Sequence, residues 1–289
     1  MAGDKMKSEQ HKPARRYDAN YGNFQTKLYA EIRREAYGKD IGQNSWTTAE
    51  EQDKFLGWLE LTPDKTLLDV ACGAGGLTLR AAEVRGCSVT GVDIHESAVA
   101  TANSFAAERG LTKRANFQIA NAGEPLPFSD ASFDAAMCID AINHIPDRGR
   151  TLADWARLLK PGGKLLFTDP ITVTGPLTDN EIRIRSLSGF YLFVPPGFNE
   201  GLLSENGFEL LKQEDVTTNM ELIAEKRRDA RARHEKELRE IEGDSGFVEQ
   251  QEFLKTASLT AREKRLSRFA YLARKEIERN GDTSSQSRA

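Results

Sequence analysis

The sequence has 289 residues, of which 39% are hydrophobic and 29% charged, with a formal net charge of −4 and a pI near 5.8. This length suffices for one large α/β domain, and the acidic balance argues against a general nucleic-acid or membrane-surface binder. Cys72, Cys87 and Cys138 show no metal-ligand spacing, so reduced thiols and no metal site are expected. We therefore expect a cytoplasmic protein without a signal peptide or a membrane span.

The N-terminal region is expected to precede the main domain. Residues 1–16 are polar and mixed in charge, which is typical of a disordered tail. Residues 17–42 carry aromatic and aliphatic side chains at roughly helical spacing and predict one or two short helices. The run TTAEE at 47–51 predicts the capped start of another helix, which runs to about Leu61. We interpret residues 17–62 as N-terminal helices that can act as a lid.

The run LLDVACGAGGLTLR at 67–80 is the most informative stretch. A short apolar segment breaks into glycines and resumes as a helix-compatible pattern, which is the layout of a nucleotide-cradling strand, loop and helix. Small residues let the backbone approach a ligand closely, and the helix N-terminus offers free N–H groups. The alternative is a tight turn that needs glycine only for its backbone angles.

Two side chains in this run indicate the kind of ligand. Thr78 stands where a dinucleotide-binding G-x-G-x-x-G/A pattern would need a small residue. Asp69 ends the predicted strand, where its carboxylate would repel a pyrophosphate but would suit a ligand with ammonium and sulfonium groups. S-adenosylmethionine (SAM) fits this description, and a dinucleotide oxidoreductase is disfavoured.

The second predicted strand, residues 88–93, ends at Asp93, 24 residues after Asp69. An acidic residue at this place can accept hydrogen bonds from both ribose hydroxyls of an adenosine. The alternative role is an N-cap for the helix predicted at 98–109.

Further strands are predicted at 115–120, 133–139 and 164–169, with a helix over about 149–159. Strands that alternate with helices imply right-handed crossovers and a parallel sheet.

A set of motifs in consistent order over residues 60–170 points to a known family. They are DVACGAG at 69–75, GVD at 91–93, LPF at 126–128 with FD at 133–134, HIPD at 144–147 and LKPGG at 159–163. In these motifs the chain resembles the class I SAM-dependent methyltransferases, and most of all those that act on small molecules. The resemblance implies a Rossmann-like α/β fold: a seven-stranded, mostly parallel sheet with helices on both faces and an antiparallel last strand. It also implies a SAM-binding core over 63–170, with S-adenosylhomocysteine as the product.

The resemblance further implies which residues bind SAM. They are Asp69, Ala71, Cys72, Gly73, Gly75, Asp93, Ile94, Asn121, Ala122 and Ile139. Asn121 departs from the family, because many members carry an acidic residue there. Its side-chain oxygen can still accept a hydrogen bond from the adenine amino group.

The chain beyond the core is expected to cover the acceptor. The apolar run FYLFVPP at 190–196 predicts an acceptor lid over 171–204, or alternatively a hydrophobic patch that packs on the core.

Residues 205–278 are expected to complete the sheet, with a helical insertion at 217–266. The insertion predicts either an added cap or a contact between subunits of a homo-oligomer, and its alternating charges indicate a solvated face. The expected elements are strands at 208–211 and 267–273, helices at 221–242 and 247–254, and a disordered tail at 279–289.

Methyl transfer is an in-line displacement in which the protein orients the nucleophile and excludes water. His144 follows the fourth strand and Asp169 ends the fifth. The resemblance to some small-molecule and sugar O-methyltransferases implies a histidine base with an acidic partner at these two positions. The alternative for His144 is a structural role. Asp140 and Asn143 are further candidates for the pocket.

We expect methylation of a hydroxyl oxygen on a small, partly apolar natural product or sugar. N-methylation and C-methylation of a small metabolite are alternatives. A further alternative is that the chain binds SAM in this fold but has a non-methylating or regulatory role.

Overall fold

The computed structural model describes residues 15–187 and 189–277. The disordered tails expected at 1–16 and 279–289 lie outside the described residues, except that helix α2 (Arg15–Gly22) already begins at Arg15.

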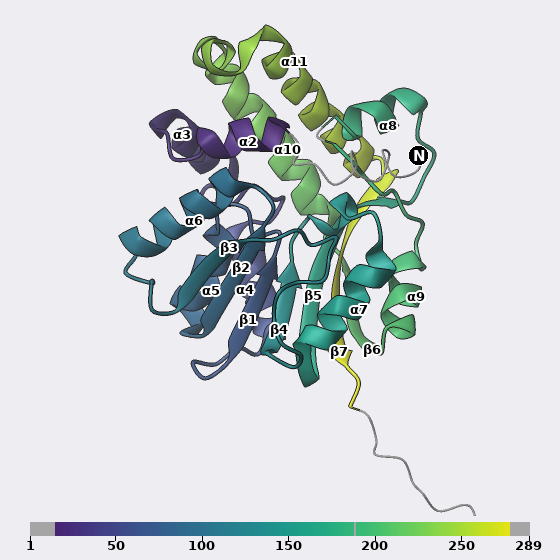
Figure 1. The fold of residues 1–289 in the computed structure, drawn as a ribbon. Helices are drawn as coiled ribbons and strands as arrows, with labels where there is room; N and C mark the ends of the chain where they lie inside the picture. The colour runs from purple at the N-terminus through teal and green to yellow at the C-terminus, as the bar shows by residue number, and fades with distance from the viewer. Residues whose placement is uncertain (1–14, 188, 278–289) are drawn as a thin grey trace, which may run out of the picture.

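The described residues form a seven-stranded sheet in the order β3-β2-β1-β4-β5-β7-β6 (Figure 1). Strand β7 pairs antiparallel with β5 and β6, whereas β1 to β5 pair in parallel. The predicted seven-stranded sheet with an antiparallel last strand is therefore confirmed. The strands are β1 (Thr66–Val70), β2 (Ser88–Asp93), β3 (Ala115–Ile119), β4 (Phe133–Cys138), β5 (Leu159–Val173), β6 (Phe208–Asp215) and β7 (Leu266–Lys275).

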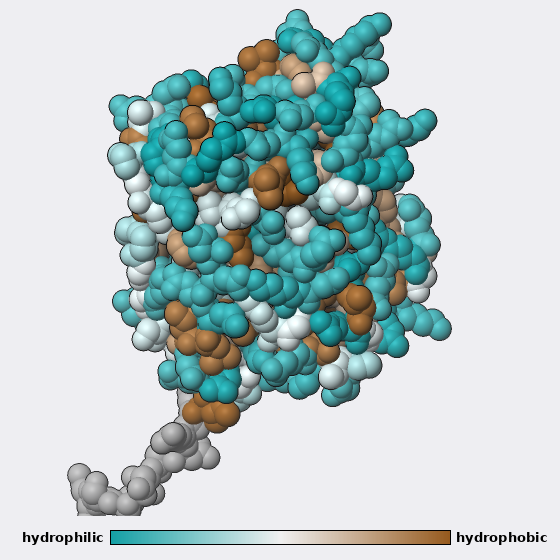
Figure 2. Space-filling view, turned by 180° about the vertical axis from the view of Figure 1, so that it is seen from behind, coloured by the Kyte–Doolittle hydropathy of each residue, from teal (hydrophilic) through white to brown (hydrophobic). Residues whose placement is uncertain are grey.

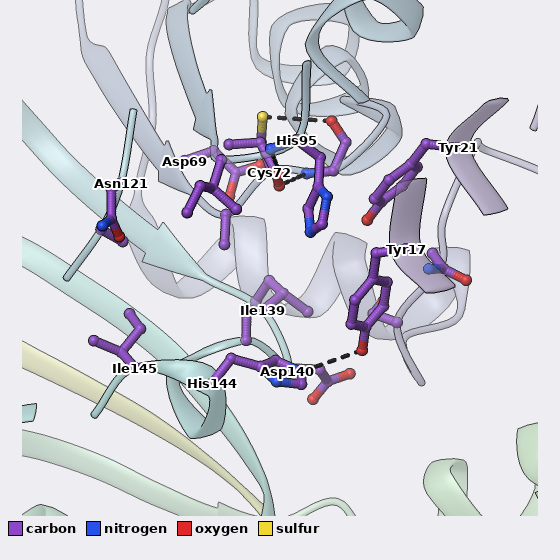
Figure 3. Close-up of a pocket in the computed structure, with 18 of the residues that line it drawn as sticks. Tyr17, Tyr21, Asp69, Cys72, His95, Asn121, Ile139, Asp140, His144 and Ile145 are labelled. Carbon is purple, nitrogen blue, oxygen red and sulfur yellow. Dashed lines mark hydrogen bonds between the residues drawn. The ribbon is translucent and has the colours of Figure 1, made fainter. Parts of the chain in front are cut away.

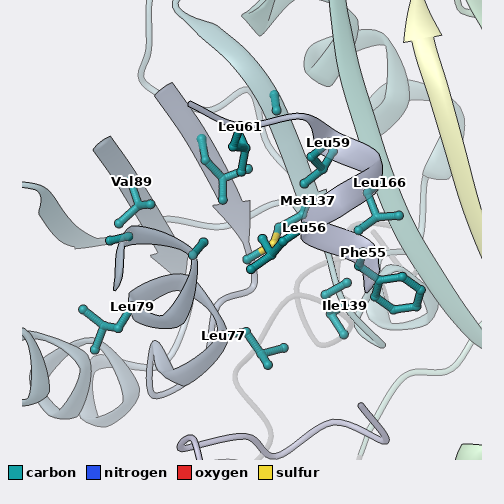
Figure 4. Packing of buried hydrophobic residues seen from close by; sticks show 14 of the residues in the cluster. Phe55, Leu56, Leu59, Leu61, Leu77, Leu79, Val89, Met137, Ile139 and Leu166 are labelled. Carbon is teal, nitrogen blue, oxygen red and sulfur yellow. The ribbon is translucent and has the colours of Figure 1, made fainter. Parts of the chain in front are cut away.

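Helices cover both faces of the sheet, so the central strands are nearly continuous apolar runs. One face packs against α4 (Ala49–Leu59), α5 (Gly76–Arg85) and α6 (Glu96–Glu108). Figure 4 shows Phe55, Leu56 and Leu59 of α4 directed at Met137 and Leu166 of the sheet. The opposite face packs against α7 (Arg148–Leu158) and α9 (Phe198–Glu205).

The start of α4 agrees with its predicted cap. The Thr48 hydroxyl accepts a hydrogen bond from the backbone N–H of Glu51, which satisfies one of the free donors of the first turn.

A group of helices lies over the carboxyl edge of the parallel strands, at the top of Figure 1. It comprises α2, α3 (Lys27–Tyr37), α8 (Asp179–Arg185), α10 (Thr217–Arg233) and α11 (Glu235–Arg262). The inner faces of α3, α8, α10 and α11 share a hydrophobic cluster that includes Trp46, Met220 and Phe253. We call this group the cap.

The cap differs in detail from the predicted elements. The helix expected over 221–242 is divided, because His234 leaves helical geometry between α10 and α11. Helix α11 kinks at Gly243, whose φ of 75° is readily adopted by glycine. In the expected lid, the short helix α8 was not predicted, and the aromatic run has no helix but forms a bridge between Val194 and Thr172.

The surface seen from behind is largely hydrophilic, with small separate hydrophobic areas (Figure 2). None of the helices in the described part of the chain combines the length and hydrophobicity that a membrane crossing requires.

Candidate active site

A cavity of about 220 Å³ opens at the carboxyl ends of β1, β2 and β4 (Figure 3). All of the predicted cofactor residues except Gly75 line it. They are Asp69, Ala71, Cys72, Gly73, Asp93, Ile94, Asn121, Ala122 and Ile139. Tyr17 and Tyr21 of α2 form the opposite wall and are absent from the predicted site, because an aromatic stripe at helical spacing favours packing over ligand contact.

Gly75 has a packing role in this loop. It precedes α5 with a φ of 74°, and a Cβ there would lie 2.8 Å from Cβ of Ala102 and 2.9 Å from the Phe117 ring. Its glycine therefore lets α5 and α6 pack close to the sheet, as a tight βα turn requires.

Asp93 organises the loop from the end of β2. Its carboxylate accepts hydrogen bonds from the backbone N–H of Gly73, at 2.8 Å, and of His95, at 2.9 Å. The alternative N-cap role is not formed, because His95 occupies the N-cap position of α6. Burial raises the pKa of Asp93, so a ligand that donates hydrogen bonds to the ionised carboxylate would relieve part of this cost.

Asp69 is buried at the end of β1 and accepts a hydrogen bond of 2.5 Å from the hydroxyl of Thr78. Burial raises its pKa to about 7. The carboxyl forms no salt bridge with any described residue, so a cationic ligand could supply the missing positive charge. Thr78, noted in the sequence for breaking the dinucleotide pattern, is thus the polar partner of Asp69.

Asn121 also lines the cavity. Its side-chain oxygen accepts a hydrogen bond of 3.0 Å from the backbone N–H of Gly123. One lone pair of that oxygen remains for an adenine amino group.

A second cavity of about 430 Å³ lies between the cap and the sheet edge. It shares five wall residues with the first cavity, namely Tyr17, Asn44, Ser45, Asp140 and His144. The expected lid contributes Arg185, Leu187 and Tyr191 to its wall, and α10 and α11 contribute the opposite side. The two cavities therefore meet at His144 and Tyr17, as two halves of one site.

His144 lies in a short 3₁₀ turn at this junction. Its Nδ1 is 3.0 Å from the carbonyl oxygen of Phe190, and its Nε2 is 3.2 Å from the hydroxyl of Tyr17 (Figure 3). A carbonyl can only accept, so Nδ1 carries the proton and Nε2 presents its lone pair to the junction. Burial lowers the pKa of His144 to about 4, so the imidazole is neutral near pH 7.

The expected pairing of His144 with Asp169 is not formed. Asp169 is fully buried under α7 and α9, where its carboxylate binds Arg148 at 2.5 Å and the amide of Asn199 at 2.9 Å. It lines neither cavity, because β5 continues past it to Val173 and turns its side chain into the core.

Asp140 does lie at the site and lines both cavities. Its carboxylate accepts hydrogen bonds from Nε of Arg268 at 2.7 Å and from the backbone N–H of Trp46 at 2.8 Å. Arg268 of β7 also donates a hydrogen bond to Glu51 of α4. Buried ion pairs therefore connect β7 and α4 to Asp140 at the junction of the two cavities. Asn143 faces the second cavity, and its side-chain oxygen has no hydrogen-bond partner among the described residues.

Comparison with known proteins identifies the class. A family model for a methyltransferase domain matches residues 61–187. A 27-O-demethylrifamycin SV methyltransferase of Amycolatopsis mediterranei is 32% identical over 201 residues, which are 65% of this chain and 74% of that protein. The chain belongs to the class I SAM-dependent methyltransferases, and its cofactor is SAM.

Two other matches differ in chemistry. A 24-methylenesterol C-methyltransferase 2 of Oryza sativa subsp. japonica is 32% identical over 171 residues, covering 57% of this chain and 47% of that protein. The solved structure of the cyclopropane synthase MmaA2 of Mycobacterium tuberculosis has a TM-score of 0.78 at 18% identity, covering 92% of this chain and 99% of that one. The fold of this chain is therefore shared with that structure over nearly the whole length of both chains.

Proposed function

We propose that this enzyme transfers a methyl group from SAM to a hydroxyl oxygen of a small molecule that binds in the second cavity. The observation that carries the proposal is the position of His144, with an unprotonated Nε2 at the junction of the two cavities.

The first cavity fits SAM. Asp69 is a buried carboxylate that lacks a cationic partner among the described residues, as a site for ammonium or sulfonium groups requires. Asp93 lines the same cavity, which supports its proposed role as acceptor for the ribose hydroxyls, and Gly73 keeps the loop open, because a Cβ there would lie 2.6 Å from the Tyr21 hydroxyl. When bound, SAM supplies an electrophilic methyl group.

The acceptor needs help from the protein, because a hydroxyl is a poor nucleophile at neutral pH. Nε2 of His144 is placed to accept the hydroxyl proton as the oxygen attacks, and the hydrogen bond from Nδ1–H to Phe190 stabilises the imidazolium that forms. The Tyr17 hydroxyl makes this hydrogen bond to Nε2, at the place where an acceptor hydroxyl would lie. Tyr17 and Tyr191, whose rings flank His144, would keep water from the reacting atoms.

An amine acceptor would not need the base. The lone pair at Nε2 of His144 therefore favours an oxygen atom over a nitrogen atom as the acceptor of the methyl group.

Incubation with methyl-labelled SAM and a library of hydroxylated small molecules tests the proposal. We expect labelled products whose label sits on oxygen, with far less product from His144→Ala and unchanged product from His234→Ala. His234 is a suitable control because it lies between α10 and α11 and lines neither of the two cavities. Label found only on nitrogen or carbon would refute O-methylation.

A further inference from the structure

The second cavity contains a buried cation that has no counterion among the residues for which the structure gives positions. Arg185, the last residue of α8, is 1% exposed and lines the cavity wall. Its Nε and Nη1 are buried without a hydrogen-bond partner, and it forms no salt bridge with any residue that the structure describes. An arginine does not deprotonate in proteins, so this charge persists in the buried site.

Aromatic rings give this guanidinium only partial compensation. Its central carbon lies 4.6 Å from the ring centre of Phe253 and 5.8 Å from that of Trp46. Such contacts stabilise a cation but satisfy none of its N–H donors. The buried donors of Arg185 therefore still need an acceptor.

A second cation lies against the same indole ring. The guanidinium of Arg227 is 5.7 Å from the Trp46 ring centre, and within the described part of the chain it donates only to Asn44, through the carbonyl and side-chain oxygens of that residue at 3.3 and 3.2 Å. It too has no carboxylate partner among the described residues. Arg185 and Arg227 therefore direct two uncompensated charges at one part of the cavity.

The other charged groups of the cavity wall are already engaged or exposed. Arg231 binds Glu242 through both of its terminal nitrogens. Asp140 binds Arg268, and Glu249 is exposed on α11.

We propose that the acceptor carries an anionic oxygen group, a carboxylate or a phosphate ester, which Arg185 binds with the assistance of Arg227. This inference rests on the proposed function, in that the second cavity is taken as the acceptor site. The planar guanidinium of Arg185 presents its donors in a fork that matches such a group. A single molecule would then place its hydroxyl at His144 and its anion at Arg185, the last residue of α8.

Binding of simple probes tests the anion site directly. Benzoate, phenyl phosphate and the neutral benzamide are titrated by calorimetry into the full chain saturated with S-adenosylhomocysteine. We expect at least one of the two anions to bind tenfold or more tightly than benzamide. The tighter anion identifies the group as a carboxylate or a phosphate. Equal affinity for all three probes would overturn the proposal.

Variants assign the effect to Arg185. Arg185→Gln should weaken binding of the preferred anion tenfold or more, and its affinity for S-adenosylhomocysteine should stay unchanged. Arg183→Gln is the matched control, because Arg183 lies on the same helix but is exposed and binds Asn180. Anion binding that survives Arg185→Gln in a folded protein would overturn the assignment.

Arg227→Gln provides a second route if Arg185→Gln does not fold. Arg227 is partly exposed and is held by hydrogen bonds to Asn44 and by the Trp46 ring, so its replacement disturbs the core less. It should weaken anion binding several-fold, and no change would count against the site.

The same experiments separate this inference from the proposed function. If neutral hydroxyl compounds are methylated equally by wild type and Arg185→Gln, and benzoate and phenyl phosphate do not compete, then the anion site is wrong and O-methylation stands. If the anions bind through Arg185 but no hydroxyl is methylated, the anion site stands and O-methylation is wrong.

Discussion

Nε2 of His144 lies 3.2 Å from the hydroxyl of Tyr17, a residue 127 positions earlier in the chain. This contact joins the SAM-binding core to α2 at the point where the two cavities meet. An acceptor hydroxyl that binds Nε2 of His144 must therefore take over the hydrogen bond that the Tyr17 hydroxyl makes to it.

Tyr17→Phe tests this relationship between α2 and the base. Loss of the competing hydroxyl leaves Nε2 free while the aromatic ring stays in place. We expect methyl transfer to be retained, with a KM for the acceptor that is equal or a few-fold lower. Steady-state kinetics of wild type and Tyr17→Phe measure both kcat and the KM for the acceptor. A loss in kcat of about 10²-fold, comparable to that expected for a general base, would instead place Tyr17 in the proton path.

The buried pair of Arg148 and Asp169 is predicted to stabilise the fold and to have no direct part in the chemistry. Both side chains are fully buried, so Asp169→Asn leaves an arginine without its counterion. The expected loss in the free energy of unfolding is about 3–5 kcal/mol, measured by urea denaturation.

The double variant Arg148→Met, Asp169→Asn is the control for this pair, because it removes both charges. It should recover much of the stability. An Asp169→Asn protein of normal stability with a large loss of kcat would contradict the structural role.

Much of the fold could be predicted because its signals are local. Apolar runs that end in glycine or acidic residues gave the positions of the core strands, and the TTAEE run gave the start of α4. The kink at Gly243 falls between the helices expected at 221–242 and 247–254, whereas the break at His234 could not be predicted, because a charged helix with few apolar positions does not show where it packs.

The cofactor side of the site was more predictable than the acceptor side for a similar reason. Asp69 and Asp93 end strands, and strand ends gather at one edge of a parallel sheet. The partner of Asp169 and the wall that contains Arg185 depend on how α9 and the helices of the cap fold back, which no local pattern records.

Gly75 and Gly110 provide a matched test of the packing role in the glycine loop. Both have positive φ angles, of 74° and 67°, but a Cβ meets close neighbours only at Gly75. Gly110→Ala should cost about 1–2 kcal/mol of stability through backbone strain alone. Gly75→Ala should cost an additional 1–3 kcal/mol, roughly, through overpacking against Ala102 and Phe117. Equal losses in urea denaturation would contradict the packing role.

Asp69 should couple SAM binding to proton release. Its pKa of about 7 in the free protein means that it is largely protonated at pH 6. A cationic ligand favours the carboxylate and lowers this pKa, so binding at pH 6 releases a proton and affinity rises with pH until about pH 7. Calorimetry in buffers of different ionisation enthalpy measures the release. Asp69→Asn should abolish it, and a wild-type protein that releases no proton would contradict a cation at Asp69.

Asp93→Ala should weaken SAM binding by about 1.5–3 kcal/mol, the scale of hydrogen bonds to a charged group. Calorimetry measures the change, and Asp130→Ala is the control, because Asp130 is an exposed acid 77% accessible to solvent. Unchanged affinity in Asp93→Ala would refute the ribose assignment.

The central claim is that neutral His144 takes a proton from an acceptor hydroxyl, and kcat measured against pH for wild type and His144→Ala tests it most directly. Because burial lowers the pKa of His144 to about 4, the wild-type kcat should be level from about pH 6 to 8 and fall only in more acidic solution. His144→Ala should lose about 10²-fold or more in kcat across this range, with its SAM affinity unchanged. A variant that keeps full kcat, or a wild-type profile that follows the pKa of an amine acceptor, would contradict the claim.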